Sequence, residues 1–270
     1  MKARDFQHKN IVVTGAASGL GRALSLRFSE AGARVCGLDV DGVGLQETGA
    51  LLEQSKADWR GIVCDITDPQ KVQETFETFE SELGGVDLLI NNAGISHRSE
   101  FSRTKITVFQ RIIEINLLGA IHCTHAAIQS LIARKGMIIA VSSVAGFAPL
   151  IARTGYAASK HGMHGFFESL RSEVGDLGVD ILMVYPSFIN TNIIKNALGA
   201  DGKAVQHEQA VIGGRLEPHQ AAEQIFAAAS KAKRKLVLGA TGKLSWWTYK
   251  FFPRIYERGM IRQLNSELQR

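Results

Sequence analysis

The sequence of 270 residues contains little cysteine and no cysteine cluster. Its three cysteines, Cys36, Cys64 and Cys123, stand apart in apolar surroundings, without a CxxC pair or a Cys/His group. This spacing argues against a disulfide framework and a structural zinc site, and it favours reduced, buried thiols. We therefore predict no metal ligands.

Long apolar runs are also missing. No uninterrupted stretch approaches the ~18 apolar residues of a membrane-spanning helix. The few residues before the first apolar run, at 11–13, are mostly charged or polar, and they do not fit a signal or transit segment. The sequence therefore predicts a cytoplasmic protein.

Charge is unevenly distributed. Residues 231–270 carry ten Lys or Arg and two Asp or Glu, so this tail has a net charge of +8, and −3 is left for the rest of a chain of +5. The basic character belongs to the tail, so it does not argue for a body that binds nucleic acid.

Short β-branched runs alternate with longer helical patterns along the first 240 residues. Helices are expected at 20–31, at 69–83 after an Asp68 N-cap, at 105–133 and around Tyr156. The expected strands are 10–14, 34–39, 61–65, 86–91, 136–143, 179–186 and 235–239. This order predicts one α/β domain, Rossmann-like and doubly wound around a parallel sheet of about seven strands, with residues 241–270 as a helical extension.

The first expected strand runs directly into the glycine-rich turn TGAASGLG, which precedes the first helix. Glycines allow close backbone approach to a pyrophosphate, and a helix N-terminus offers free amides. Asp39 ends the second strand, where an acid bonds a ribose 2′-hydroxyl and repels a 2′-phosphate. No Lys or Arg at 16–18, or directly after Asp39, could receive that phosphate, so the pattern favours NAD over NADP. The alternative is that Asp39 is only a surface turn acid.

Tyr156 and Lys160 lie four residues apart, on the same face of their helix. A nearby fixed cation favours the phenolate, so this pair predicts a lowered pKa for Tyr156 and a proton-transfer role.

Taken together, these motifs closely resemble the short-chain dehydrogenase/reductase family over about residues 8–240. The matching segments are TGAASGLG, CDIT, NNAG at 91–94, INLLG with Asn116, SSVAG with Ser143, YAASK and YPSFINT. In the last segment Ser187 replaces the usual glycine, which is the single departure and concerns the local backbone.

The resemblance implies that Tyr156 is the general acid or base and that Lys160 lowers its pKa and holds the nicotinamide ribose. Ser143 would bond the substrate oxygen, and Asn116 would anchor a water between Lys160 and solvent. The alternatives are a turn hydroxyl for Ser143, a satisfied buried amide for Asn116 and a helix N-cap for Thr191. The cofactor residues implied are Gly15, Ser18, Gly19, Leu20, Gly21, Asp39, Asp65, Ile66, Asn91, Asn92, Ala93, Gly94, Tyr156, Lys160, Pro186, Ile189 and Thr191.

The loops at 95–98, 144–153 and 187–198 should contact the substrate, because they follow the carboxyl ends of strands. Their apolar residues favour a hydrophobic secondary alcohol or ketone, unless they only pack the loops themselves. These residues are Phe147, Leu150, Phe188, Ile193, Ile194 and Leu198. His97 could contact a polar substrate group, but a solvated loop position is preferred. His122, His125, His161 and His164 are expected on helix surfaces or at a subunit interface.

The extension 241–270 is rich in aromatic and basic residues. After Pro253, Ile255, Tyr256, Met260 and Leu264 can share one helical side, with arginines on another. This pattern fits peripheral contact with a membrane surface. The alternative, which is preferred, is a tail folded over its own or a neighbouring subunit.

The function predicted is an NAD(H)-dependent oxidoreductase for a hydrophobic secondary alcohol and its ketone. The resemblance implies a homodimer or homotetramer through the helices at 105–133 and 154–175. One alternative is an NADPH-dependent 3-oxoacyl reductase of lipid synthesis. A second, from another class, is a non-catalytic dinucleotide-binding sensor or scaffold.

Overall fold

The computed structural model describes residues 3–53, 57–191, 196–205 and 214–265. At its centre is a seven-stranded sheet in the order β3-β2-β1-β4-β5-β6-β7, with every neighbouring pair parallel. The strands are β1 Asn10–Thr14, β2 Arg34–Asp39, β3 Trp59–Val63, β4 Leu88–Asn91, β5 Met137–Val141, β6 Asp180–Tyr185 and β7 Lys235–Val237. The predicted fold class is confirmed.

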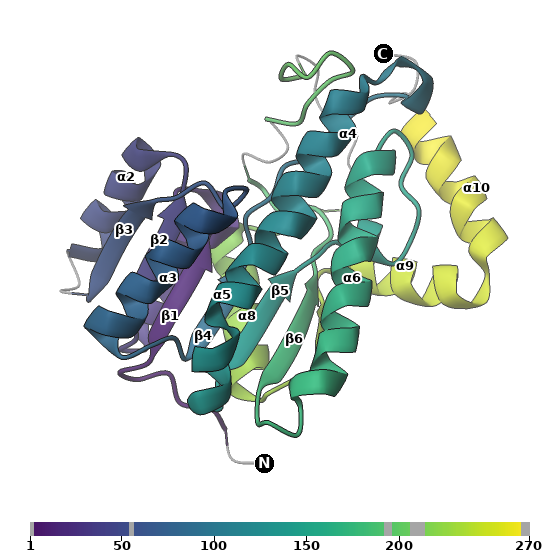
Figure 1. Cartoon of the computed structure of the whole chain (residues 1–270). Coiled ribbons are helices and arrows are strands. Elements are labelled where there is room, and N and C mark those ends of the chain that lie inside the picture. Colours follow the sequence, from purple (N-terminus) through teal and green to yellow (C-terminus); the bar gives the residue numbers. More distant parts are fainter. Residues whose placement is uncertain (1–2, 54–56, 192–195, 206–213, 266–270) are drawn as a thin grey trace.

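Helices cover both faces of the sheet, as Figure 1 shows for α3, α5 and α6 on one face and α8 behind it. The body helices are α1 Gly19–Glu30, α2 Gly42–Glu53, α3 Pro69–Leu83, α4 Ile106–Ile113, α5 Gly119–Ala133, α6 Thr154–Val174 and α8 Pro218–Ser230. Helices α2 and α8 were not predicted.

Side chains of successive strand residues point to opposite faces, so the sheet divides the core in two. On one face Ile11 and Val13 of β1 pack with residues of α1 and α8. On the other, Val12 of the same strand packs with residues of α3, α5 and α6. Both faces are buried, which explains why the central strands read as continuous apolar runs.

Local signals account for several helix ends. The Asp68 side chain accepts hydrogen bonds from the amides of Gln70 and Lys71, and Pro69 occupies the first helical position of α3. The predicted N-cap is therefore confirmed. The α3 helix ends at Gly84, whose φ of 70° is left-handed.

The long helix predicted at 105–133 is interrupted. Between α4 and α5, residues Glu114–Leu118 form one turn of π-helix (η2). By length and composition alone, the stretch Ile106–Ala133 is the one in the described part of the chain that could cross a membrane. In the fold, however, Cys123 and Leu131 of α5 are fully buried in the core that faces α3. Buried residues make up 33% of the most apolar part of this stretch, so the protein interior uses its apolar character in part.

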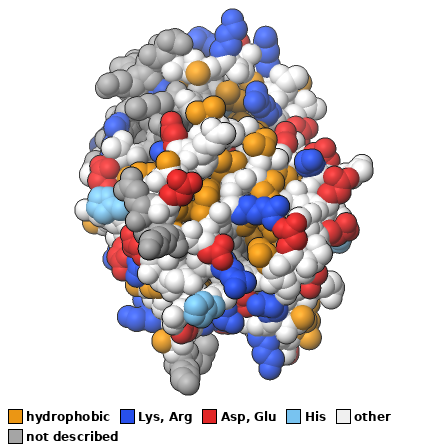
Figure 2. Space-filling model, turned by 90° about the vertical axis from the view of Figure 1, so that its left-hand side faces the viewer, with side chains coloured by type: hydrophobic (Ala, Val, Ile, Leu, Met, Phe, Trp, Pro, Cys, Tyr) orange, Lys and Arg blue, Asp and Glu red, His pale blue; other side chains and the backbone are white. Residues whose placement is uncertain are grey.

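Figure 2 looks onto the side of the molecule that carries α2 and the edge strand β3, where hydrophobic side chains gather in a hollow between charged ones. The exposed apolar residues of these two elements and the turns beside them are Val40, Val43, Leu51 and Val63. Strand β3 was predicted at 61–65, two residues too late. Its pairing with β2 ends where Asp39 meets Val63.

Two helices follow β7, α9 Ala240–Phe251 and α10 Pro253–Leu264. In Figure 1 they form an L at the right-hand side of the molecule, with α10 rising beside α6. The inward side of α10 carries Tyr256, Met260 and Leu264, as predicted, but Ile255 is 63% exposed. Trp246 of α9 stacks edge-on against Phe147, with ring centroids 4.6 Å apart. The extension therefore packs on its own chain.

Candidate active site

A cavity of about 1120 Å³ lies at the carboxyl ends of the strands. It spans the point where β1 neighbours β2 on one side and β4 on the other, which is where ligands bind in doubly wound sheets. Its walls come from the glycine-rich turn, the ends of β4, β5 and β6, the start of α6, and helices α9 and α10. Most of the predicted site residues meet here.

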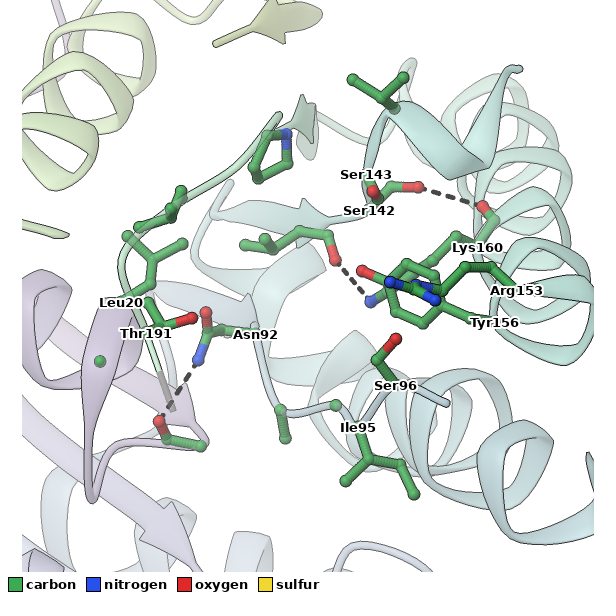
Figure 3. A pocket seen from close by; sticks show the side chains of 18 of the residues that line it. Leu20, Asn92, Ile95, Ser96, Ser142, Ser143, Arg153, Tyr156, Lys160 and Thr191 are labelled. Atoms are coloured by element: carbon green, nitrogen blue, oxygen red, sulfur yellow. Dashed lines mark hydrogen bonds between the residues drawn. The ribbon is translucent and has the colours of Figure 1, made fainter. Parts of the chain in front are cut away.

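The glycine-rich turn forms one end of the cavity. Gly15 and Gly19 have φ values of 70° and 54°, a conformation that suits glycine. A Cβ on Gly15 would lie 2.9 Å from Ala93 Cα, so no side chain fits there. Asn92 donates from Nδ2 to the carbonyl oxygens of Thr14 and Gly15, at 3.0 and 3.3 Å, which clamps the turn onto the end of β4 (Figure 3).

The N-terminus of α1 lies at this end of the cavity, and the first amides of a helix have no intrahelical partners. In the described part of the chain Ser18, at the N-cap, makes no capping bond with its side chain, and it lines the cavity with Leu20. The turn therefore fits the pyrophosphate of a dinucleotide. Gly21 does not line the cavity: a Cβ there would lie 1.9 Å from the Gly15 oxygen, so its role is close packing.

Asp39 stands at the cavity edge at the end of β2. Its carboxylate accepts hydrogen bonds from the amides of Ala17 and Asp41, at 3.0 and 3.1 Å. The nearby Arg22 guanidinium is bound to the Ala17 carbonyl and to Glu47. The two amides hold the Asp39 carboxylate in place, and the Arg22 guanidinium is engaged with partners other than Asp39.

Other predicted cofactor residues line the same cavity: Asp65, Ile66, Ala93, Gly94, Pro186, Ile189 and Thr191. Asn91 is an exception and corrects the prediction. It is buried, and its Nδ2 donates to Thr124 Oγ1 at 2.9 Å, because it is the last residue of β4 and points into the core. Ser187 also lines the cavity, and no positive φ is found there among the described residues, so serine fits in place of glycine.

Ser143, Tyr156 and Lys160 meet at the other end of the cavity (Figure 3). Ser143 follows β5, and its Oγ accepts a hydrogen bond from the Ala145 amide at 3.2 Å. The hydroxyl proton is then left to donate, and its hydrogen bond with Tyr156 favours the phenolate form. The predicted triad is thus brought together at a cavity that also contains the glycine-rich turn.

Comparison with known proteins agrees with this geometry. A family model described as short chain dehydrogenase matches residues 9–201. The chain belongs to the short-chain dehydrogenase/reductase family.

Relatives of this family resemble the chain over most of its length. Dehydrogenase/reductase SDR family member 7B of Rattus norvegicus is 35% identical over 95% of this chain and 82% of its own. The 3-oxoacyl-(acyl-carrier-protein) reductase FabG of Escherichia coli is 32% identical over 88% of this chain and 96% of its own. A short-chain dehydrogenase/reductase from Burkholderia phymatum, solved in complex with NAD, superposes with a TM-score of 0.82 at 23% identity, covering 95% of this chain and 96% of that one.

As a short-chain dehydrogenase/reductase, the protein is an oxidoreductase with a nicotinamide dinucleotide as its cofactor. The residues at the cavity fit that group. A Cβ on Gly94 would lie 3.0 Å from Asn116 Oδ1 and 3.5 Å from Lys160 Nζ, so glycine keeps the cavity open beside the lysine.

Lys160 is 3% exposed, and its Nζ donates to the Val141 carbonyl oxygen at 2.9 Å. The ammonium lies 5.9 Å from the centroid of the Tyr156 ring. Burial lowers the pKa of Lys160 to about 8. The lysine is therefore fixed at the site and close to the edge of its charged range at neutral pH.

The predicted lowering of the Tyr156 pKa is wrong for this structure. Burial raises the pKa of Tyr156, and this outweighs the hydrogen bond with Ser143 and the charge of Arg153, which act to lower it. A sequence shows that a lysine is near, but it does not show how much water the fold removes from a phenol. The phenol in this structure keeps its proton at neutral pH.

Asn116 lies within the π-helical turn and is completely buried. Its Oδ1 accepts from the Ile95 amide at 2.8 Å, and its Nδ2 donates to the Ile95 carbonyl and to Ser159 Oγ, each at 2.9 Å. This is the satisfied buried amide that was the alternative for this residue. The side chain ties the loop after β4 to α6, and its predicted role as a water anchor stays a prediction.

Arg153 was not singled out from the sequence, yet it lines the cavity beside Tyr156 with 4% of its surface exposed (Figure 3). It follows Ala152, whose φ of 57° is unusual for a residue with a side chain. Strained backbone of this kind concentrates at functional sites. The loop 144–153 was predicted to contact substrate, but nothing in its residue pattern indicates which side chain would turn inward.

His97 is buried rather than solvated, which corrects the preferred prediction. Its Nε2 accepts a hydrogen bond from the Gly155 amide at 2.9 Å, so in the neutral ring Nδ1 carries the proton and donates to Ser99 Oγ at 3.2 Å. Burial, together with the charge of Arg153, lowers the pKa of His97 to about 4. The histidine thus fastens the loop after β4 to the first turn of α6.

Two of the other predicted histidines contact the body rather than stand free on helix surfaces. His122 Nδ1 lies 3.0 Å from the Ile66 carbonyl oxygen, and His164 contacts the Tyr185 hydroxyl. The three cysteines are buried, as predicted.

Helices α9 and α10 form a roof over the end of the cavity next to the loop after β5. Tyr256 Oη donates to the Pro149 carbonyl at 3.2 Å, which joins α10 to the loop after β5. The roof residues on the cavity are Thr241, Leu244, Ser245, Thr248, Ile255, Tyr256, Gly259, Met260 and Gln263. The preferred prediction folded this tail over its own or a neighbouring subunit, but it did not place the tail on the cavity.

The predicted apolar pocket is found in part. Leu150 and Phe188 line the cavity, as does Ile189. Phe147 instead packs on Tyr185 and Trp246, and Leu198 bonds through its backbone to the chain at 96–98. Ile193 and Ile194 lie outside the described residues.

Proposed function

We propose that the protein catalyses the NAD(H)-dependent interconversion of an apolar secondary alcohol and its ketone. One observation carries the proposal: Ser143, Tyr156 and Lys160 face a cavity that is continuous with the glycine-rich turn and Asp39. A dinucleotide extended between the two ends would place its nicotinamide beside the phenol. The cofactor then supplies or accepts the hydride.

Each residue of the triad has a distinct task in this proposal. Tyr156 donates its hydroxyl proton to the substrate oxygen in reduction and takes it back in oxidation. Ser143 donates a hydrogen bond to the same oxygen and stabilises negative charge as it develops. Lys160 holds the nicotinamide ribose hydroxyls with the donor that the Val141 carbonyl and Met163 Sδ leave free, and its charge favours the phenolate.

The acidic residue at the end of β2, Asp39, favours NAD over NADP as the cofactor. The Asp39 carboxylate is held at the adenosine end by two backbone amides, where it can accept from a ribose 2′-hydroxyl and would repel a 2′-phosphate. Arg22, the cation closest to that turn in sequence, is engaged with the Ala17 carbonyl and Glu47. Titrating the protein with NADH and with NADPH tests this preference, and tighter NADPH binding would overturn it.

The substrate class rests on the cavity beyond the triad. Leu150 and Phe188 of the body face Leu244, Ile255 and Met260 of the roof. Such a lining suits an apolar body attached to one carbinol or carbonyl group. Steroid, retinoid, long-chain and small polar alcohols assayed with NAD would identify the class, and exclusive turnover of small polar alcohols would contradict it.

A second candidate is a 3-oxoacyl reductase, which the similarity to the Escherichia coli enzyme favours. NADPH-linked reduction of a 3-oxoacyl thioester by the protein, without oxidation of apolar alcohols by NAD, would select this candidate.

The substitution Tyr156→Phe distinguishes an enzyme from a protein that only binds the dinucleotide. We expect the variant to lose turnover by several orders of magnitude and to retain NADH binding, because only the phenolic hydroxyl is removed. Unchanged turnover would remove Tyr156 from the reaction. Absence of turnover in the unmodified protein, with dinucleotide binding intact, would favour a sensor or scaffold.

The helices at 105–133 and 154–175 are proposed to join subunits in a homodimer or homotetramer, by analogy with the family. Sedimentation velocity of the purified protein tests this, and a monomer at all concentrations would exclude it.

A further inference from the structure

The outer side of the roof carries a group of exposed apolar residues. We name it the apolar corner: Leu244, Trp247, Phe251, Phe252 and Ile255, each between 57% and 68% exposed. The corner lies where α9 meets α10, at the right-hand edge of the molecule in Figure 1. Trp247 and Phe251 stack with their rings 5.7 Å apart and nearly parallel. Large apolar groups gathered in this way mark a surface that binds something.

The exposure of the corner does not come from a loosely attached tail. On the inner side of the same helices, Trp246 packs on Phe147 and lies under the Lys235 ammonium, 3.7 Å from its ring centroid. Met260 is 8% exposed, and its Sδ lies 3.4 Å from the Ile151 amide. The inner side anchors both helices, so the outer side is held outward.

The corner is also continuous with the inside of the cavity. Leu244 and Ile255 line the cavity and are at the same time 68% and 63% exposed. They therefore form part of the cavity rim. An apolar molecule could pass from the surface contacted by the corner into the cavity without crossing water.

The positive charge around the apolar corner indicates what kind of partner binds there. Lys243, Lys250, Arg254, Arg258 and Arg262 are exposed on α9 and α10, and Glu257 is the acidic residue of these two helices. Basic side chains beside large aromatic ones suit the interface of an anionic bilayer, where rings enter the headgroup region and cations stay at the phosphates. A protein partner would more often be met by a rim of mixed charge.

We propose that the apolar corner docks on the surface of an anionic lipid bilayer and that the cavity takes its apolar substrate from that bilayer through the Leu244–Ile255 rim. The loading step rests on the proposed function. Docking does not, because it concerns only the outer side of the roof.

Vesicle co-sedimentation of the full-length protein tests docking. We expect the protein to sediment with vesicles of phosphatidylcholine mixed with phosphatidylserine, and about tenfold less with phosphatidylcholine alone. Trp247→Ser combined with Phe251→Ser should reduce binding to the mixed vesicles at least about tenfold, because the two rings supply buried apolar area. The matched control is Val43→Ser with Val63→Ser, two exposed residues at the opposite side of the molecule, which should bind as the unmodified protein does.

Charge is tested separately. Lys250→Glu should weaken binding to the mixed vesicles, and added salt should weaken binding of the unmodified protein. Lys71→Glu, an exposed lysine on α3, is the control and should have a smaller effect. Equal sedimentation of all variants, or none with either vesicle, would overturn the proposal. A dimer that dissociates in the Trp247→Ser, Phe251→Ser variant, without vesicle binding, would assign the corner to a second copy instead.

Loading is read out by turnover. The Trp247→Ser, Phe251→Ser variant should oxidise a water-soluble alcohol at the unmodified rate and lose rate on an apolar alcohol supplied in mixed vesicles. Equal loss on both substrates would refute loading through the corner. If the unmodified protein turns over no alcohol but still docks, the proposed function fails and the docking surface stands.

Discussion

At the scale of single residues, burial shifts the pKa of both members of the Tyr156–Lys160 pair, and for Tyr156 the shift is opposite to the predicted one. Burial raises the pKa of the phenol and lowers the pKa of the ammonium to about 8. Reduction of a ketone needs the protonated phenol, and oxidation of an alcohol needs the phenolate. The site of the free protein is thus set for reduction near neutral pH.

This gives a prediction for the pH dependence. A group with a raised pKa keeps its proton to higher pH, so kcat/KM for oxidation should still rise as pH approaches and passes 10.0, the ordinary pKa of tyrosine. In the same range kcat/KM for reduction should fall. Steady-state rates in both directions from neutral to alkaline pH provide the measurement. A plateau of oxidation starting near neutrality would mean that the bound cofactor reverses the effect of burial.

Arg153 provides a second prediction at the same scale. Its charge lowers the pKa of Tyr156, so Arg153→Met should move the alkaline rise of oxidation to higher pH. Arg153→Lys keeps a cation and should restore part of the original profile. A profile that is the same in all three proteins would show that Arg153 serves structure alone.

At the scale of elements, His97 joins the loop after β4 to the first turn of α6. Its folded pKa of about 4 lies below its ordinary value of 6.5, so its buried neutral form contributes fully above pH 6.5. As pH falls from 6.5 to about 4, His97 is protonated in the unfolded chain but stays neutral in the folded chain, so protonation stabilises the unfolded state. The free energy of unfolding that is lost over this pH range is on the order of 3 kcal/mol.

We therefore expect the free energy of unfolding to decrease between pH 6.5 and 4, and to decrease less in His97→Gln, which cannot titrate. Urea denaturation at a series of pH values measures both. His125→Gln, an exposed histidine on α5, should follow the unmodified protein. If His97→Gln shows the same acid dependence, another group is responsible.

The α3 helix offers a simple stability test. Asp68 accepts from two amides of its first turn, so Asp68→Ala should reduce the free energy of unfolding by about 1 kcal/mol. Asp68→Asn, which keeps a capping oxygen, should lose less. Equal losses in the two variants would mean that charge matters at this helix end, rather than the hydrogen bonds.

At the scale of the whole molecule, the roofed end of the cavity is built from two segments that lie far apart in the sequence. The Tyr256 hydroxyl of α10 bonds the Pro149 carbonyl of the loop after β5. Tyr256→Phe should raise KM for an apolar alcohol about fivefold, which corresponds to the loss of about 1 kcal/mol, and leave NADH affinity unchanged. Tyr249→Phe serves as the control on the same roof. A change in NADH affinity in Tyr256→Phe would mean that the whole cavity has shifted.

Much of the architecture could be predicted because local sequence patterns indicate it. The central strands are continuous apolar runs, the Asp68–Pro69 pair marks a helix start, and the glycine-rich turn stands between a strand and a helix. The edge strand β3 was misplaced because its burial is partial, so its apolar residues do not define its ends.

The rest depended on contacts between distant segments. Nothing local to His97 indicates that it will accept from Gly155, or that Asn116 will satisfy Ile95 within a π-helical turn. The pKa of Tyr156 follows from removal of water by the assembled fold. The tail was expected to pack on a subunit, but its place over the cavity was not, because Trp246 of α9 meets Phe147 only in three dimensions.

The segment that matches the family ends at residue 201, whereas the roof begins only at 240. Tyr156 and the glycine-rich turn therefore lie within that matched segment, and α9 and α10 add a further wall to the cavity after it. A chimaera that exchanged α9 and α10 for the corresponding helices of a relative would alter which molecules are accepted, while the proton donor and the nucleotide clamp stayed as they are.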